Sequence, residues 1–212
     1  MVNVSKPTIE ELFDESRFEQ LAVLPYNEMV PFVQEQFKHK NNIIRLYIAA
    51  NISILIVMMM IGAWQVGTER IGAVVLMSAT FLGFFASLTV LIPIHEAIHA
   101  AAYKWAGAPQ VSFGSNWKKI YFYAAADRFV ADSNSFRIIA LAPFIVISTV
   151  LILLILIIPI WWQWLLWGTL LIHTGACAGD FGMLGFYERY NGKAVFTFDD
   201  VMEKKAYFFR AR

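Results

Sequence analysis

The chain has 212 residues, enough for one domain, of which 58% are apolar and 16% charged, against roughly 45–50% and about 25% in ordinary soluble proteins. One water-soluble core cannot bury that many apolar side chains, so the composition excludes an ordinary soluble globule. A net charge of +1 argues against a nucleic-acid partner, and the single cysteine, Cys177, excludes an internal disulfide framework.

Residues 1–40 are polar and acidic, with no cleavable signal peptide evident, and we expect them to form a cytoplasmic N-terminal segment. Thr8 followed by Glu11 predicts a capping box at the start of a short helix. Pro25 and Pro31 should interrupt any continuation of that helix. The acidic residues between Thr8 and Pro25 are typical of a helix face exposed to solvent.

Four long apolar runs follow, and each exceeds the ~20 residues that a membrane-spanning helix needs. We therefore predict an all-α membrane protein with four transmembrane helices. The membrane domain should cover residues 41–190, with a cytoplasmic basic tail at 191–212. The runs lie at residues 43–64, 71–95, 136–158 and 161–186.

Lysine and arginine are distributed unevenly around these runs. They cluster before the first run, after the second and after the fourth, whereas only Arg70 lies between the first and second and none lies between the third and fourth. The positive-inside rule then places both termini and the central loop in the cytoplasm. Trp161, Trp162 and Trp164 are predicted to form an interfacial belt at the opposite membrane surface.

The loop between the second and third runs is more than a plain linker. Residues 111–113 and 120–123 are rich in β-forming side chains, and Gly114-Ser115-Asn116 between them is typical of a turn. This pattern predicts a short cytoplasmic β-hairpin. An interfacial loop with aromatic anchors is the equal alternative.

The second run ends in His95-Glu96-Ala97-Ile98-His99, an HExxH sequence. On a helix, residues i and i+4 share one face, so both imidazoles can reach one metal ion, and neutral histidine favours zinc. Glu96 is offset by one residue, which suits a base that acts on water. Ionisable groups in a span cost about 2.5–3.5 kcal/mol each, so this cluster indicates function rather than interfacial histidines that reach toward water.

A catalytic zinc usually has three protein ligands and a water. The candidate third ligand is Asp180, the one acidic residue within the third and fourth runs, at a depth similar to that of His95. Gly175, Gly179 and Gly182 should let the fourth run approach the second closely. A helix N-cap or an isolated salt-bridge partner is the alternative role for Asp180.

Two further polar residues lie near Asp180. His173 precedes it by seven residues, so it should share the same helical face two turns deeper. It is a candidate to orient a ligand or to contact the substrate, with a buried, hydrogen-bonded histidine as the equal alternative. Cys177 is able to bind zinc as a thiolate, but a small packing residue is the favoured interpretation.

These motifs resemble the bacterial four-span membrane family known as putative zincin peptidases. The resemblance rests on HEAIHA at residues 95–100, the hairpin-like loop, Ala142-Pro143-Phe144, and Gly179-Asp180, and it covers roughly residues 40–190. It implies a multi-pass protein of the bacterial cell membrane with peptidase chemistry. It implies no particular substrate.

The chain is also similar, more distantly, to the site-2 intramembrane metalloproteases. In that group an aspartate from a later span, usually in an Asp-Gly motif, joins the HExxH span. Here Asp180 is followed by Phe181 and then Gly182, and His173-Thr174-Gly175 stands where that group often has an Asn-Pro element. The second motif therefore matches only in part.

The leading hypothesis is a zinc metalloendopeptidase, with zinc on His95, His99 and Asp180 and with Glu96 activating the water. Its expected substrates are transmembrane or juxtamembrane polypeptides cut near the cytoplasmic face, with residues 109–123 pairing with an extended substrate. The alternative is a non-proteolytic metal-binding protein, a pseudoprotease, that regulates a partner. A transporter is disfavoured because polar groups gather at one edge and no inverted repeat is evident. Four histidines are too few for a histidine-rich di-iron site.

Overall fold

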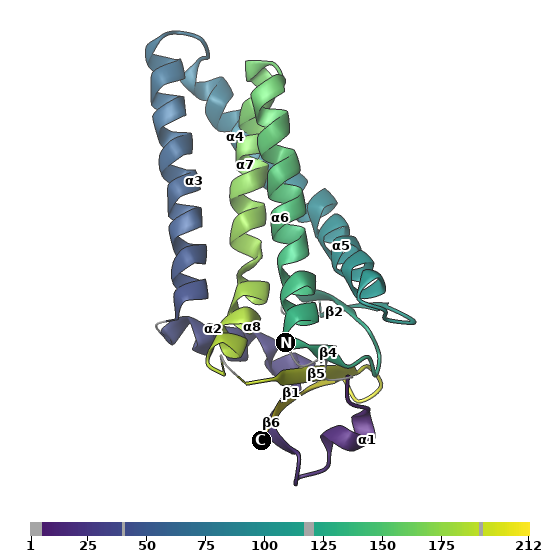
Figure 1. Ribbon diagram of the computed structural model, residues 1–212. Helices are drawn as coiled ribbons and strands as arrows, with labels where there is room; N and C mark the ends of the chain where they lie inside the picture. The colour runs from purple at the N-terminus through teal and green to yellow at the C-terminus, as the bar shows by residue number, and fades with distance from the viewer. Residues whose placement is uncertain (1–5, 40, 117–120, 191–192) are drawn as a thin grey trace.

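The computed structural model describes residues 6–39, 41–116, 121–190 and 193–212. Long helices form a shaft, and a small β-sheet lies across one end of it, which we call the sheet end (Figure 1). Within the described ranges, three helices are long and apolar enough to cross a membrane. They are α3 (Asn42–Gly67), the continuous run Ala73–Trp105, and α6 (Ser133–Ile157).

The run Ala73–Trp105 changes its helical pitch before the HExxH sequence. It consists of α4 (Ala73–Ala86), the π-helix η2 (Ser87–Leu91) and α5 (Ile92–Trp105). Pro93 lies in the first turn of α5 and has no N–H for the carbonyl one helical turn earlier. A wider turn is one way for a helix to accommodate such a missing bond, and π-bulges of this kind often occur at functional sites.

The predicted fourth span is divided into two helices. α7 (Ile160–Ala176) has 17 residues, and α8 (Ala178–Glu188) follows it after a break at Cys177, whose ψ is 4°. The Tyr47 hydroxyl of α3 lies 3.0 Å and 2.7 Å from the carbonyl oxygens of Thr174 and Gly175, at the carbonyl end of α7. The break places Asp180 in the first turn of α8.

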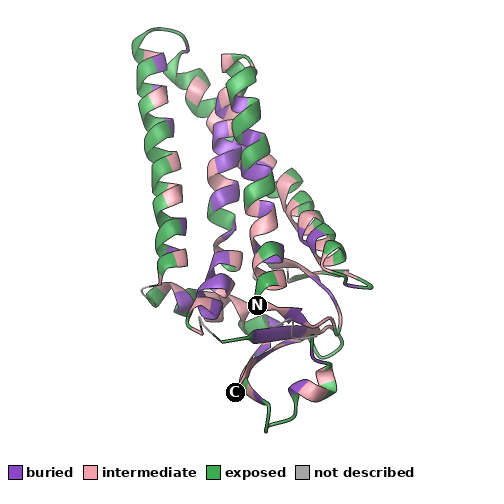
Figure 2. Ribbon diagram, viewed as in Figure 1, coloured by how far each residue is buried: buried purple, intermediate pink, exposed green. Residues whose placement is uncertain are grey.

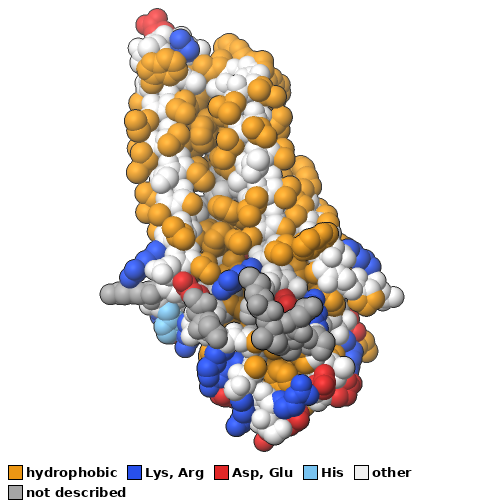
Figure 3. Space-filling model, in the orientation of Figure 1, with side chains coloured by type: hydrophobic (Ala, Val, Ile, Leu, Met, Phe, Trp, Pro, Cys, Tyr) orange, Lys and Arg blue, Asp and Glu red, His pale blue; other side chains and the backbone are white. Residues whose placement is uncertain are grey.

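Most of the surface of the shaft is apolar. In Figure 2 buried residues concentrate on α7, whereas the outer face of α3 is largely exposed. In Figure 3 hydrophobic side chains cover the shaft, and charged side chains gather at the sheet end with a few at the opposite tip. A shaft of this kind suits a lipid environment better than water.

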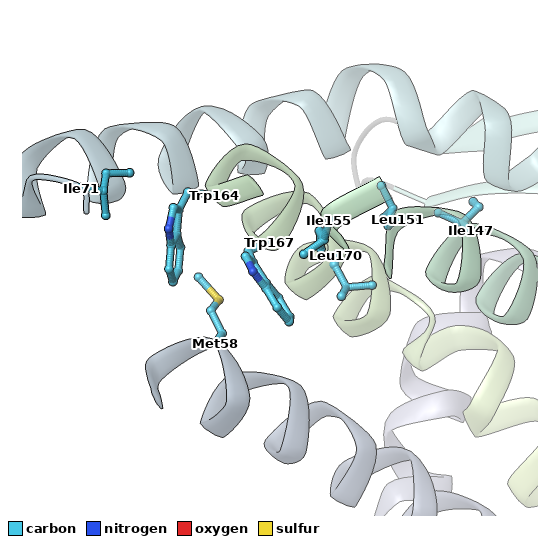
Figure 4. Packing of buried hydrophobic residues seen from close by; sticks show 8 residues of the cluster. All are labelled: Met58, Ile71, Ile147, Leu151, Ile155, Trp164, Trp167 and Leu170. Carbon is cyan, nitrogen blue, oxygen red and sulfur yellow. The ribbon is translucent and has the colours of Figure 1, made fainter. Parts of the chain in front are cut away.

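A cluster of apolar residues holds the shaft together away from the sheet end (Figure 4). Trp164 is 1% exposed in this cluster, and its indole N–H donates to Gln65 Oε1 at 2.8 Å. Trp161 and Trp162 are 57% and 60% exposed. The predicted interfacial belt therefore does not include Trp164, which is a core residue. The cluster consists of Met58, Ile71, Ile147, Leu151, Ile155, Trp164, Trp167 and Leu170.

Two glycines bring α4 and α7 into backbone contact. A Cβ atom added at Gly83 would collide with the Leu165 carbonyl, and one added at Gly168 would collide with the Thr80 carbonyl. The glycines expected for this role lie elsewhere: Gly175 and Gly179 meet nothing within 4 Å, and Gly182 faces Val33 of α2 (Met29–Lys38). The expectation that those three residues bring the helices together was wrong.

A four-stranded sheet joins the two ends of the chain. Its strand order is β1-β6-β5-β4, and all neighbours are antiparallel. The prediction of an all-α protein missed this sheet. The strands are β1 (Phe18–Pro25), β4 (Ala131–Asp132), β5 (Val195–Asp200) and β6 (Lys205–Ala211). The short helix α1 (Ile9–Leu12) precedes β1, and the 3₁₀ turn η1 (Tyr26–Glu28) follows it.

The Thr8 capping box is present at α1, as predicted. In the central loop, β2 (Ser112–Asn116) and β3 (Tyr121–Ala125) pair antiparallel. Gly114, Ser115 and Asn116, which were expected to form the turn, are instead part of β2. The connection at residues 117–120 lies outside the described residues.

Candidate metal centre

Three side chains predicted to bind a metal meet at the sheet end of the shaft. His95 and His99 project from α5, and their Nε2 atoms are 3.0 Å apart. Asp180 of α8 places Oδ2 3.3 Å from His95 Nε2 and Oδ1 3.2 Å from His99 Nε2. The three ligand atoms form one group within 4.8 Å of one another.

This geometry fits a tetrahedral zinc ion. Ligand atoms that bind zinc at ~2.0–2.1 Å with tetrahedral angles are about 3.3 Å apart. The two Nε2 atoms are 3.0 Å apart, and each lies 3.3 Å or 3.2 Å from one of the two Asp180 carboxylate oxygens. Two imidazole nitrogens and one carboxylate oxygen also match the chemistry of a catalytic zinc site, which leaves a fourth position for water. The residues present therefore fit the metal.

The tautomer of His99 is fixed by a neighbouring helix. His99 Nδ1 lies 2.9 Å from the carbonyl oxygen of Ile139 in α6. A carbonyl only accepts, so Nδ1 carries the proton and Nε2 of the neutral ring keeps its lone pair for a metal. The Ile139 carbonyl is free because the residue four positions later in α6 is Pro143, which has no N–H.

The break between α7 and α8 positions the third ligand. Asp180 lies in the first turn of α8, an 11-residue helix, where the unpaired backbone N–H groups carry a partial positive charge. That field stabilises a carboxylate there. A continuous helix through Cys177 would not have provided it.

Glu96 lies beside the cluster without joining it. Its Oε2 atom is buried and has no hydrogen-bond partner among the described residues. The backbone amide of Ala124 in β3 lies next to the same carboxylate. A buried carboxylate oxygen without a partner is costly, and a water molecule held at the metal position would supply one.

A family model described as "Putative zincin peptidase" matches residues 88–193, half of the chain. The chain belongs to this family. The description indicates a metallopeptidase with zinc as its metal, and the matched range contains both HExxH histidines, Glu96 and Asp180. No curated protein and no solved structure matches the chain.

His173 and Cys177 form a second group around the zincin site. His173 is buried, and the centroid of its ring lies 5.7 Å from that of the His95 ring. The His173 ring also hydrogen-bonds to the backbone of Pro143. Cys177 Sγ lies 3.9 Å from His173 Nε2, and His95, His173 and Cys177 also lie within metal-binding distance of one another. His95 belongs to both groups, so one ion would occupy one set or the other.

A cavity of about 290 Å³ connects the zincin site to the β-sheet. At one end it is lined by the candidate metal ligands His95, His99 and Asp180, and at the other by Tyr26, Tyr123 and Asp199. Sequence reasoning missed this second end, because Tyr26 and Asp199 come from opposite ends of the chain. The one available signal was the pair of acidic residues, Asp199 and Asp200, that follows two phenylalanines in the stretch 195–200.

Proposed function

We propose that the protein is a zinc-dependent membrane metalloendopeptidase that hydrolyses peptide bonds of transmembrane or juxtamembrane polypeptides near the cytoplasmic face. The observation that carries the proposal is the convergence of His95, His99 and Asp180, from two separate helices, at tetrahedral ligand distances beside a buried Glu96. Family membership supports the same chemistry.

Each residue has a defined role in this proposal. His95, His99 and Asp180 hold the metal, which when bound supplies a Lewis acid for the scissile carbonyl. Glu96 accepts a proton from the attacking water and returns it to the leaving amine, so that one water is consumed and one acid and one amine are formed. His99 keeps its ligand nitrogen unprotonated through the bond to Ile139.

The distribution of charged side chains supports a location of the site at the membrane edge. The segments rich in lysine and arginine lie at the sheet end, where charged side chains gather in Figure 3, and we infer that this end is cytoplasmic. We also infer that α7 with α8 completes a fourth crossing. The metal centre then lies where the span Ala73–Trp105 leaves the bilayer.

The strand β3 is suited to hold an extended substrate. It pairs with β2 along one edge, and the two form a two-stranded sheet in the described part of the chain. Ala124 in β3 places its amide beside Glu96. We infer that a substrate adds as a strand to the other edge of β3, with its scissile bond at the metal.

The test compares wild-type protein with the Glu96→Gln variant, each added to membranes isolated from source cells that lack their own copy of the protein. Mass spectrometry of new N-termini should reveal cleavage products with the zinc-loaded wild type and none with Glu96→Gln, while both bind equal zinc. Identical N-termini in the two samples would overturn the peptidase proposal and favour the pseudoprotease alternative.

A further inference from the structure

Asp199 lies at the end of the cavity remote from the metal centre. It is in β5, and its Oδ1 accepts a hydrogen bond from the Tyr26 hydroxyl at 3.1 Å. Asp199, Tyr26 and Tyr123 line the same cavity as His95 and Glu96. The sheet that joins the termini therefore contributes a carboxylate to the space where a substrate would bind.

This carboxylate has no cationic partner among the described residues, although its acidic neighbours do. Asp200 contacts Arg128 at 3.9 Å, and Glu203 contacts Lys205 at 2.9 Å. The group facing Asp199 is another acid, Asp127, whose segment pairs with β5 through a backbone bridge. A carboxylate in a largely apolar cavity without a cation is costly, and asparagine would satisfy the Tyr26 hydroxyl equally well.

The distance between the metal centre and Asp199 corresponds to a few residues of an extended substrate. The Ala124 amide lies beside Glu96, and the preceding residue, Tyr123, packs its ring 4.8 Å from that of Tyr26. Tyr26 in turn hydrogen-bonds to Asp199. An extended chain advances about 3.3 Å per residue, so a substrate along β3 would reach Asp199 roughly two to four residues from the cut bond.

We propose that Asp199 is a specificity-determining residue that binds a lysine or arginine side chain of the substrate on the cytoplasmic side of the cut bond. This inference rests on the proposed peptidase function. Membrane proteins concentrate lysine and arginine where a span enters the cytoplasm, so the expected substrates carry such a cation at the required place. Burial and the nearby charge of Asp127 together raise the pKa of Asp199 to about 7. A bound cation would favour the ionised form of Asp199.

The test uses two synthetic peptides, each with one apolar span and a juxtamembrane stretch containing either lysine or glutamine in a scanned position. Binding is measured by fluorescence anisotropy on detergent-purified, zinc-loaded Glu96→Gln protein, so that no cleavage is needed. The lysine peptide should bind at least about tenfold more tightly, and the added substitution Asp199→Asn should abolish that preference. Asp200→Asn, which alters an adjacent acid that does not line the cavity, is the matched control and should retain it.

The outcomes separate the two proposals. Equal affinities for the two peptides, binding of neither, or a lysine preference that survives Asp199→Asn would each overturn the role of Asp199. A lysine preference in binding without cleavage by the wild type would retain the recognition site and refute the peptidase. The peptide comparison on Glu96→Gln alone needs no change at Asp199, so equal affinities there would overturn the role of Asp199 even if Asp199→Asn fails to fold, as judged by its zinc content.

Discussion

Pro143 and His99 are connected through a single carbonyl group. Pro143 removes the backbone N–H that would bond to the Ile139 carbonyl, and that carbonyl instead accepts the proton of His99 Nδ1 at 2.9 Å. A proline inside a long apolar helix thus orients a candidate metal ligand on a neighbouring helix. The hydrogen bond between His99 and the freed carbonyl gives a reason for a proline at a helical position where this residue is usually unfavourable.

Replacing Pro143 with alanine should lower zinc affinity by about ten- to hundredfold, because the new N–H competes for the Ile139 carbonyl. Competition with a chromophoric zinc chelator measures this. Alanine is favoured over proline by about 3 kcal/mol in a helix interior, so the metal-free variant should not melt below metal-free wild type. Pro159→Ala, at the opposite end of the shaft, is the control. Unchanged zinc affinity in Pro143→Ala would show that Pro143 does not influence metal binding through the Ile139 carbonyl.

Removing Cys177 distinguishes the two possible ligand sets. If zinc binds His95, His99 and Asp180, Cys177→Ala should keep near one zinc per chain, while Asp180→Ala should weaken binding and a His95→Ala/His99→Ala double variant should abolish it. Metal analysis of protein purified in detergent gives the stoichiometry. Loss of zinc in Cys177→Ala with retention in Asp180→Ala would assign the ion to the set that includes His173.

The contact between α4 and α7 makes Gly83→Ala destabilising. The added methyl group would collide with the Leu165 carbonyl, and overpacking of this kind costs about 1–3 kcal/mol. The melting temperature in detergent should fall by several degrees. Gly175→Ala, where nothing lies within 4 Å, should leave it unchanged or slightly higher. Equal melting of the two variants would show that the backbones do not touch at Gly83.

Asp199 should make stability depend on pH near neutrality. Burial raises its pKa from 3.8 to about 7 in the folded protein, with Asp127 adding to the shift and the Tyr26 hydrogen bond opposing it. The folded state then holds the proton more tightly than the unfolded chain. The protonated acid therefore favours folding at pH 4, and this contribution, at most about 4 kcal/mol, is lost as pH rises toward 7 and slightly above.

The measurement compares melting of metal-free wild type and Asp199→Asn between pH 4 and pH 8. Tyr123 also faces this group and has a raised pKa, but it stays neutral over that range. Wild type should lose stability relative to Asp199→Asn as pH rises. Parallel curves would mean that Asp199 is ionised throughout.

The chemistry of the site was more predictable than its surroundings. The spacing of His95 and His99 depends only on helical periodicity, and Asp180 was recognisable because acids are rare in apolar runs. The break at Cys177 was not predictable, since apolar composition continues through it. Trp164 was assigned to an interface because composition alone does not reveal which tryptophan has a buried partner such as Gln65.

The sheet was missed for a different physical reason. β1 pairs with β6, and partners this far apart in sequence leave no local signal beyond short β-rich segments. The register Phe18↔Ala211 to Pro25↔Lys205 depends on helices that first bring the two ends together. The arrangement of Tyr26 and Asp199 in one cavity depends on the same long-range pairing.

The pairing of β1 with β6 has a consequence for biosynthesis. β1 precedes all the apolar helices and β6 follows them, so the sheet that holds the cavity-lining Ala206 and Phe208 of β6 closes only after the last helix has been made. A nascent chain would insert its HExxH helix well before Asp180 and Asp199 emerge from the ribosome. The order of synthesis thereby delays completion of the candidate metal centre and of its cavity until these later segments have been made.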